Sequence, residues 1–518
     1  MKKTLMVIIF WGMVCSVVVS AQAPQEKKLT LKDAIYYALE NNLGLQVQKA
    51  RTQVAQLNFQ ISRAQLYLPT LTVNSSYDKS KQPSTDIYQG VDSVEEKSFT
   101  QSLGISQQTP FGGIFSLDFS ASRETTNVVT ETFDPKLDTS LTASLSQPLL
   151  QNFGALATNY QIYIAANDHK ISKHQLEEAI VNLVYDVESA YWELVFAHQN
   201  LDAAKTALER AKDLLKQNEV KVKVGTAAPI EILSSKANVA RNESTVIQAE
   251  QAIRTREEAL KRILNMSKDP FPVIPGEGPE IKDVPIDFEA FLKEALENRT
   301  DMKRAKINLE SSGLTVKYRR NQALPNLLLD ASYESTGVGG TTWDFTTNNP
   351  FDPDFQRFKT EETSFKDTIN EIFKLKNTVQ GISLNLQTPI PFTAGRAQLA
   401  QAKIERERAL LEFKEVENTV FFEVKEAIKE LESNRKLVDA DKIALELAGE
   451  TLKAEEKKLS VGLSTNFNVL QYQQQYAAAQ TQLLRSTIDY VLTQARIKRT
   501  LNRTFKAYDI KVDDGPGK

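Results

Sequence analysis

The stretch that decides the fold is VGTAAPIEIL at residues 224–233, which recurs as VGLSTNFNVL at residues 461–470. In each phrase a glycine, Gly225 or Gly462, is typical of the left-handed position that ends a helix. The Thr/Ala stretch of the first phrase and the Ser/Thr/Asn stretch of the second are expected to open the next helix. We therefore predict two helical hairpins, with the chain reversing direction at these two tips.

A heptad pattern precedes each tip. Apolar residues spaced alternately 4 and 3 apart predict a coiled-coil seam on a long helix in each copy, at about 155–223 and about 396–460. At about 1.5 Å per residue such helices extend roughly 100 Å, far longer than a globular domain needs. The seam positions are Leu176, Ile180, Leu183, Val187, Ala190, Leu194, Ala197, Leu201, Ala204, Leu208, Ala211, Leu215 and Asn218, and then Val424, Ala427, Leu431, Asn434, Val438, Leu445, Ala448, Leu452 and Leu459.

Upstream of each long helix the pattern changes to the alternation of a β-strand. The alternation begins after Leu-Pro at 68–69 in the first copy and after Leu-Pro at 324–325 in the second. A later strand of each copy ends at Gln-Pro at 147–148 or Thr-Pro at 388–389, because proline cannot donate to a strand ladder. Each copy therefore contains strands with one apolar face.

The chain is an internal duplication, which predicts two structural repeats. The first, 24–285, comprises a helix at 30–66, strands at about 68–149, the long helix at 155–223 and a return helix at 229–265. The second, 286–510, comprises a helix at 287–323, strands at about 326–336 and 379–388, the long helix at 396–460 and a return helix at 466–503. Residues 511–518 form a C-terminal tail.

The amino terminus, residues 1–23, has the features of a secretory signal peptide, with cleavage expected after Ala23. Cys15, the only cysteine in the sequence, lies inside it. A lipoprotein would need a small residue before this cysteine, where Val14 stands, and a retained anchor would need a longer apolar core. The mature chain would then have neither a disulfide nor a cysteine-based metal site.

Composition excludes several classes of protein. The formal net charge is −3, so nucleic acid is not expected as a partner. After the signal the sequence has no run of about 18 apolar residues, so no transmembrane helix is expected. Strands with one apolar face match an outer-membrane barrel, in which every backbone group is paired. One chain offers too few strands for a roomy lumen, so several chains are expected to pool them.

Catalytic, cofactor-binding and metal-binding sites are not expected. The three histidines, His169, His174 and His198, fall on one long helix without convergent ligands. The sequence has no Gly-rich phosphate loop, nucleophile elbow or metalloprotease helix. The chain is therefore not expected to be an enzyme.

Together, the Leu-Pro strand entries, the Gln-Pro and Thr-Pro exits, the two tip phrases and the duplication resemble the TolC-like outer-membrane efflux proteins. The resemblance covers nearly all of the mature chain. It implies an α+β membrane protein, a homotrimer whose chains share one transmembrane β-barrel in outer-membrane lipid and one long periplasmic α-helical barrel. It implies a location in the cell outer membrane extending into the periplasm, with a periplasmic adaptor (membrane-fusion) protein and an inner-membrane pump as partners.

The function implied by this resemblance is a passive duct for efflux or type I secretion. Two alternatives stay open. A general diffusion porin would not need helices of roughly 100 Å. A periplasmic coiled-coil scaffold would not need alternating strands bounded by proline and glycine.

The first copy departs from the family pattern of two strands per repeat. It has additional alternating stretches at 99–107 and 115–121, joined by TPFGG at 109–113. One hypothesis is an extra hairpin near 99–122 in the barrel wall, which would raise a trimeric barrel from about 12 to about 18 strands. The other is a hairpin folded outside the wall or onto a loop.

The second copy contains a long insertion at 337–376, with several aromatic residues among polar ones. By topology it should face the cell exterior, as should the shorter polar stretch at 79–97. Its aromatics could recognise an external partner, but a long loop packed on itself is the favoured interpretation.

The tips also depart from the family pattern. In TolC itself an arginine and a tyrosine of the second copy bind an aspartate of the first, and further aspartates ring the pore. The matching positions here are Ser464, Leu459 and Glu231 for the lock, and Asn468 and Gln471 for the ring. With Gly225 and Gly462 as turn formers, these residues are expected to line or close the entrance. A neutral Asn/Gln constriction would select cations less strongly than a carboxylate ring.

Overall fold

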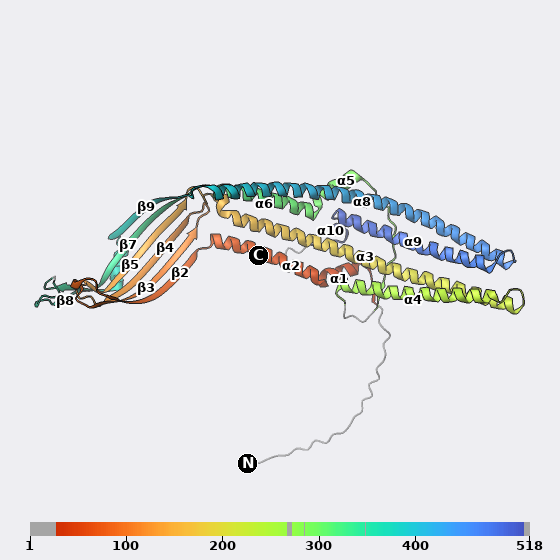
Figure 1. The fold of residues 1–518 in the computed structure, drawn as a ribbon, viewed down its shortest axis with the longest axis horizontal. Coiled ribbons are helices and arrows are strands. Elements are labelled where there is room, and N and C mark those ends of the chain that lie inside the picture. Colours follow the sequence, from red (N-terminus) through yellow and green to blue (C-terminus); the bar gives the residue numbers. More distant parts are fainter. Residues whose placement is uncertain (1–26, 267–271, 284, 348, 512–518) are drawn as a thin grey trace, which may run out of the picture. The chain divides into compact units, whose positions relative to one another are not determined.

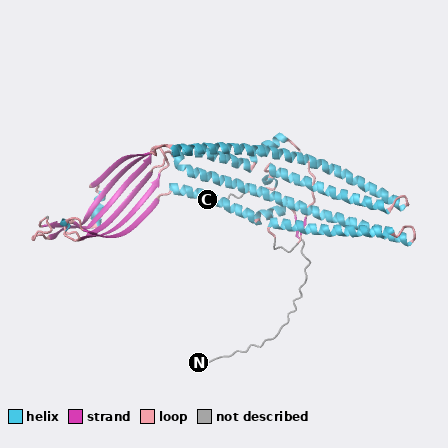
Figure 2. Ribbon diagram, in the orientation of Figure 1, coloured by secondary structure: helices cyan, strands magenta, loops and turns pink. Residues whose placement is uncertain are grey.

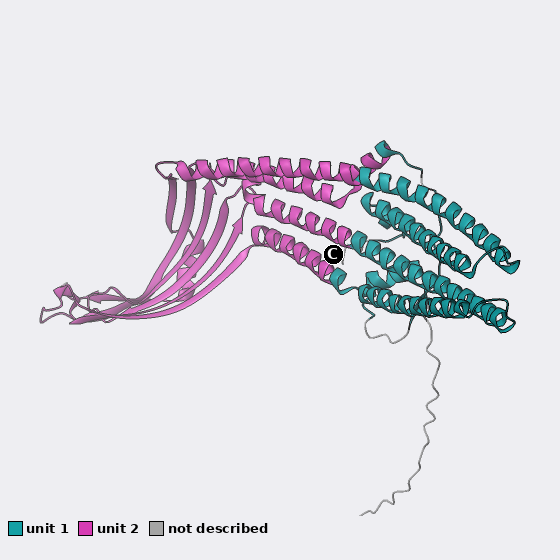
Figure 3. Cartoon of the chain, turned by 45° about the vertical axis from the view of Figure 1, so that its right-hand side comes forward, with its two compact units in different colours: residues 1–46, 180–289, 424–511 teal, residues 47–179, 290–423, 512–518 magenta. Residues whose placement is uncertain are grey.

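The structure is a computed structural model that describes residues 27–266, 272–283, 285–347 and 349–511 (Figure 1). The predicted signal peptide, with Cys15, and the tail beyond residue 511 lie outside the described residues. The chain divides into two compact units (Figure 3). Unit 1 comprises 1–46, 180–289 and 424–511, and unit 2 comprises 47–179, 290–423 and 512–518. Each unit therefore contains segments of both repeats.

Both repeats run from two helices through strands to a long helix and a return helix, but the second has α7 (Phe365–Phe373) between its strands (Figure 2). The helices are α1 (Leu31–Asn41), α2 (Leu43–Tyr67), α3 (Ala155–Lys223), α4 (Ile230–Leu264), α5 (Phe288–Asn298), α6 (Thr300–Gln322), α7 (Phe365–Phe373), α8 (Thr393–Ser460), α9 (Asn466–Thr500) and α10 (Thr504–Ala507), with a short 3-10 turn at Ile87–Gln89. The strands are β1 (Lys27–Leu29), β2 (Thr70–Pro83), β3 (Ser93–Gln108), β4 (Ile114–Thr126), β5 (Phe133–Pro148), β6 (Val273–Pro275), β7 (Asn326–Phe345), β8 (Arg357–Thr363) and β9 (Asn377–Gln387).

The first helix of each repeat is broken, whereas the sequence predicted one continuous helix. At the first break Asn42 accepts the backbone N–H of Leu45 at 3.0 Å and donates to the Ile263 carbonyl at 2.9 Å. At the second break Arg299 has the extended angles φ −61° and ψ 137°. The expectation of one helix in each segment is therefore wrong: Asn42 caps α2 with its side chain, and the Arg299 guanidinium binds Asp301 and Glu423 where the backbone is extended.

Unit 2 contains an antiparallel sheet with the order β2-β3-β4-β5-β7. On the edge of β7 opposite β5, β9 pairs with Asn326–Thr336 and β8 pairs with Gly340–Phe345. Because β8 and β9 use different stretches of β7, the sheet is six strands wide where β9 pairs and is never wider. The additional hairpin predicted near 99–122 is β3–β4, and it lies inside the sheet between β2 and β5. It is not folded outside the sheet or onto a loop.

The register places apolar and polar side chains on opposite faces of the sheet. One row of paired residues across β2, β3, β4, β5 and β7 is Leu71, Ile105, Leu117, Ala143 and Tyr333. The adjacent row, which points to the other face, is Thr72, Gly104, Asp118, Thr142 and Glu334. The β3–β4 hairpin follows the same division as its neighbours.

The insertion at 337–376 packs on itself as expected, with the Phe345 and Phe355 rings stacked 5.5 Å apart, but most of it is regular secondary structure and not a loop. β7 continues to Phe345, β8 pairs with it, and α7 packs on the sheet, where the Ser335 hydroxyl donates to the Ile372 carbonyl at 2.8 Å. A Cβ atom at Gly337 would lie 2.1 Å from the Thr368 carbonyl oxygen. Small residues of β7 therefore make room for α7 on the face where other strands carry large apolar residues.

The predicted heptad seams form much of the helical core. Val187, Leu194 and Ala211 of α3 are almost completely buried, and so are Val424 and Leu431 of α8. The small seam alanines allow close approach between helices, as the pattern predicted.

An ion pair between a half-buried lysine and a buried glutamate adds a polar element to unit 1. The Lys498 ammonium lies 2.5 Å from Glu188, which is 2% exposed, and 3.0 Å from the Tyr508 hydroxyl. Burial, reinforced by the Glu188 carboxylate, raises the pKa of Tyr508. The Tyr508 hydroxyl also donates to Glu188, so the end of the described chain is tied to α3 and α9.

Candidate functional site

Both helix tips belong to unit 1 and have the same backbone geometry. At the first tip Thr226 N–H donates to the Lys221 carbonyl at 2.8 Å, and at the second Leu463 N–H donates to the Lys458 carbonyl at 2.8 Å. The glycine of each turn donates to the carbonyl three residues earlier. This is the Schellman arrangement, which satisfies carbonyl groups at a helix end.

The two tip glycines are needed for their backbone angles. Gly225 has φ +80° and Gly462 has φ +79°, in the left-handed region that other residues rarely adopt. A Cβ atom added at either position would meet no heavy atom within 4 Å. The constraint at both tips is therefore conformational and not steric.

The second tip contains a polar network around Glu455, a buried carboxylate of α8. Ser464 donates to Glu455 at 2.5 Å, Asn468 donates to Ser464 at 3.4 Å, and Lys458 lies 3.0 Å from the other oxygen of Glu455. The Ser464 hydrogen bond, followed by Lys458, lowers the pKa of Glu455. The ionised Glu455 therefore stabilises the network at pH values above the ordinary pKa of glutamate. This stabilisation is lost as the pH falls through the lowered pKa of Glu455.

Two of the residues predicted at the entrance, Ser464 and Asn468, are joined within their own hairpin. Among the described residues no hydrogen bond or ion pair links Glu231 of α4 to Ser464. Leu459 packs in an apolar cluster with Leu214, Leu452 and Val469. Gln471 is exposed. The structure therefore places Leu459 in packing and brings Glu231 to neither of its predicted lock partners within one chain.

Sequence reasoning missed a buried polar contact that joins the two hairpins near their tips. Ser235 of α4 accepts the Asn218 side-chain amide at 2.8 Å and the Asn466 side-chain amide at 3.2 Å. All three residues are buried, and the Asn466 carbonyl oxygen has no hydrogen-bond partner among the described residues. An available signal was the asparagine at seam position 218, because a polar seam residue often specifies register.

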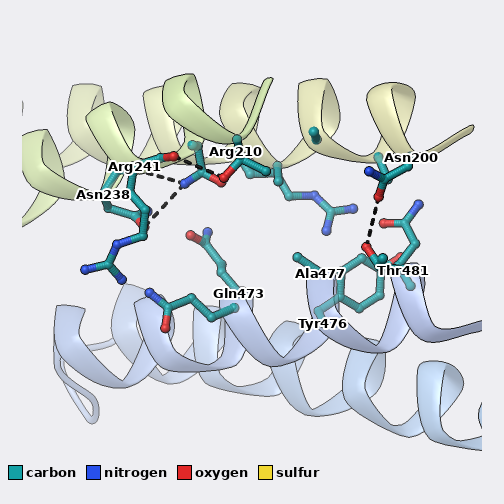
Figure 4. A pocket seen from close by; sticks show the side chains of 15 residues that line it. Asn200, Arg210, Asn238, Arg241, Gln473, Tyr476, Ala477 and Thr481 are labelled. Carbon is teal, nitrogen blue, oxygen red and sulfur yellow. Dashed lines mark hydrogen bonds between the residues drawn. The ribbon is translucent and has the colours of Figure 1, made fainter. Parts of the chain in front are cut away.

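A cavity of about 210 Å³ lies between α3, α4 and α9 (Figure 4). It is lined largely by amide and hydroxyl side chains, and Thr481 donates to Asn200 across it at 3.4 Å. The Arg210 guanidinium lies 4.6 Å from the centre of the Tyr476 ring. A Cβ atom at Gly449 would approach Tyr476 to 3.1 Å, so this glycine of α8 allows the ring to pack closely. The interface between the two hairpins is therefore polar here and leaves a cavity between the side chains.

Within the described ranges, no cluster of three or more His, Cys, Asp or Glu residues is placed to hold a metal ion. None of the described helices is both long and apolar enough to cross a membrane. What the tips offer is a set of turns and polar contacts that can hold two hairpins together or release them.

Comparison with known proteins agrees with this fold. Residues 114–266 and 291–503 match the model of a family described as "Outer membrane efflux protein". No curated protein matches the chain. A membrane protein from Pseudomonas aeruginosa has a similar crystal structure, with a TM-score of 0.65 at 16% identity over 91% of this chain and 93% of that chain.

Two further solved structures are similar. The CmeC outer membrane channel of Campylobacter jejuni has a TM-score of 0.63 at 16% identity over 93% of this chain and 90% of that chain. The open state of the MtrE outer membrane channel of Neisseria gonorrhoeae has a TM-score of 0.62 at 17% identity, over 91% of this chain and 88% of that chain. At these identities the likeness shows the fold alone.

Replacing Gly462 by valine should lower the free energy of unfolding by about 1 kcal/mol or more, because a β-branched residue is strained at positive φ. Thermal melting of the purified protein measures the change. Gly313→Val in α6, where φ is not positive and space is open, is the matched control and should change it by less than about 0.5 kcal/mol. Equal melting temperatures for the Gly462 variant and the native protein would contradict the role of this glycine.

Replacing Ser235 by alanine should cost about 1–3 kcal/mol of stability, because two buried amide groups lose their acceptor. Limited proteolysis at the tips, alongside thermal melting, reports whether the hairpins separate. Ser234→Ala, one residue away on the exposed side of the same helix, should stay within about 0.5 kcal/mol of the native value. A Ser235 variant as stable and as protease-resistant as the Ser234 control would refute the contact's importance.

Proposed function

The chain belongs to the outer membrane efflux protein family, and we propose that it is the outer-membrane duct of a tripartite efflux or type I secretion system. The predicted resemblance to TolC-like proteins and the predicted mixed helix-and-sheet fold with internal duplication are confirmed by the family match and the similar structures. Cargo moves passively through the duct, which its partners open, and the inner-membrane pump supplies the energy for transport.

The observation that carries this proposal is the presence in one chain of a two-faced sheet and two very long helices. Helix α3 contains 69 residues, which corresponds to about 100 Å. A general diffusion porin would have no use for helices of this length. A coiled-coil scaffold would have no use for a sheet with separate apolar and polar faces.

In this proposal the sheet lies in outer-membrane lipid and the helices extend into the periplasm. Three copies form the duct, a periplasmic adaptor protein contacts the helical hairpins, and an inner-membrane pump delivers cargo. The protein acts as a passive water-filled channel in this proposal and catalyses no reaction. These assignments follow what is general for the family.

The tips are the proposed entrance. Gly225 and Gly462 set the two turns, and Glu231, Leu459, Ser464, Asn468 and Gln471 line or close the opening. Because Ser464 and Asn468 are bound to Glu455 inside their own hairpin, closing the entrance does not use the charged lock known from TolC. The Ser235 contact between α4 and α9 is the one we expect to resist separation of the two hairpins.

Deleting the gene should increase sensitivity to members of a panel of bile salts, dyes and antibiotics, or remove proteins from the secretome. The panel distinguishes drug efflux from protein secretion, and the native gene supplied on a plasmid should restore the original behaviour. Unchanged sensitivity together with an unchanged secretome would count against the duct.

Purified protein in planar bilayers should conduct ions with little block by multivalent cations, because the tip ring positions Asn468 and Gln471 are neutral. Asn468→Asp should introduce block, since a carboxylate from each copy would then face the pore. Asn349→Asp, which adds the same charge in unit 2, should leave the native behaviour unchanged. Block of the native channel at micromolar levels of multivalent cation would overturn the assignment of these tip residues.

A further inference from the structure

The sheet of unit 2 has two edges that are unpaired in one chain. Within the described residues, β2 pairs with β3 alone and β9 pairs with β7 alone. Apolar side chains on these edge strands are uncovered, including Val73 at 69% exposure and Ile382 at 83% exposure. In lipid there is no water to bond unpaired backbone N–H and C=O groups, so these edges need a partner.

In the proposed function three copies share one barrel, so β2 of one copy pairs with β9 of the next. Resting on that function, we propose that all six strands of each copy, the β3–β4 hairpin included, form the barrel wall. Three copies then close a ring of eighteen strands, six from each chain. The β3–β4 hairpin is part of this wall, and the outer-membrane section is correspondingly wider than the twelve-strand ring expected from two strands per repeat.

Strand direction supports this closure. Consecutive neighbours in the order β2-β3-β4-β5-β7-β9 are all antiparallel, so β2 and β9 run in opposite directions. Rotating one copy about a central axis therefore brings β9 alongside the next β2 as another antiparallel pair. An inserted hairpin adds two strands and keeps the total even, so it does not disturb this closure.

The side chains of the inserted hairpin also support its place in the wall. Phe99, Leu103 and Ile105 of β3 lie on the apolar face, paired with Tyr77, Val73 and Leu71 of β2. On the other face, Ser102 of β3 pairs with Ser120 of β4, and Ser120 with Ser140 of β5. An apolar face toward lipid and a polar face toward water is the pattern of a membrane barrel strand.

The hairpin is tightly built into the polar face as well. A Cβ atom at Gly104 would lie 2.3 Å from an Asp118 carboxylate oxygen, so glycine makes space for this side chain of the next strand. The turn between β3 and β4 is closed by Thr109 N–H donating to the Gly113 carbonyl at 2.6 Å. Gly112 in this turn has φ +94°. The β3–β4 hairpin therefore packs into the sheet along its length and ends in a well-defined turn.

The edges match each other in chemistry. On β2 the apolar face carries Leu71, Val73 and Tyr77, and on β9 it carries Ile382, Leu384 and Leu386. Pairing β2 with β9 therefore continues both faces around the ring without a break. A second copy of this chain satisfies the strand direction, the face pattern and the backbone pairing at once.

The expected consequence is a wide outer section. Because barrel diameter grows roughly in proportion to strand number, eighteen strands give a diameter about 1.5 times that of twelve. The cross-section then roughly doubles, so the outer-membrane section does not limit cargo size. Large solutes or unfolded polypeptides become the suited class of cargo, and the helix tips become the narrowest control point.

Cryo-electron microscopy of the purified full-length protein in lipid nanodiscs counts the strands directly. Eighteen strands in a ring of three copies support the proposal. Twelve strands overturn it, whether they come from two copies of the six-strand sheet or from three copies with the hairpin displaced.

Cross-linking tests the same pairing independently of imaging. In a Cys15→Ser background, Val73→Cys on β2 combined with Leu384→Cys on β9 should give species up to a covalent trimer with a short bismaleimide. Leu117→Cys on β4, combined with the same β9 cysteine, is the matched control and should stay monomeric. Cross-linking through β4 in place of β2 overturns the proposal.

These outcomes are separable from the proposed function. An eighteen-strand ring in a strain whose deletion has no effect on efflux or secretion would refute the function and leave the ring intact. A twelve-strand ring in a strain with a clear deletion phenotype would refute the ring and leave the duct.

Discussion

The backbone ladder between β5 and β7 joins the two repeats into one sheet, and the rest of unit 2 depends on it. Leu145 of the first repeat pairs with Ala331 of the second, and the pairing runs with one irregularity from Phe133 to Pro148. Without this ladder each repeat would have its own short sheet, with two more unpaired edges. The duplication is therefore one structural unit at the level of hydrogen bonds.

In unit 1 the two repeats are held together by side-chain contacts and not by a backbone ladder. Ser235 of the first repeat and Asn466 of the second form a buried polar contact, while Leu214, Leu452 and Val469 form an apolar cluster. The neighbouring cavity beside Tyr476 is polar and incompletely filled. Continuous backbone ladders hold the sheet together, whereas side-chain contacts hold the two hairpins together, among them the ion pairs of Glu188 with Lys498 and of Glu193 with Arg485.

The fold is shared with solved structures at 16% identity. Periodicity, turn geometry and strand alternation can be supplied by many residues, so sequences diverge while the backbone persists. Ser464, where the resemblance places an arginine in TolC, is bound to Glu455 of its own hairpin, and the hairpins are joined at Ser235.

The sequence by itself determined the long helices, the two tip turns and the alternation of the strands. These are local properties, because heptad spacing defines a helix face and positive φ at Gly225 and Gly462 depends on neighbouring residues alone. Local patterns could not predict the breaks at Asn42 and Arg299, since those residues are held by partners distant in sequence. Of the candidate site, the turn glycines could be predicted and the Ser235 contact could not.

Only the tertiary structure decided where the β3–β4 hairpin lies and that α7 covers part of the sheet. An alternating stretch has the same pattern inside a sheet or beside it, and its place depends on which strands compete for its two edges. The small residues of β7 likewise have no local explanation, because the space they leave is filled by α7, a segment that follows later in the chain. Pairing between distant segments is a property of the whole chain, and for that reason the local pattern did not reveal it.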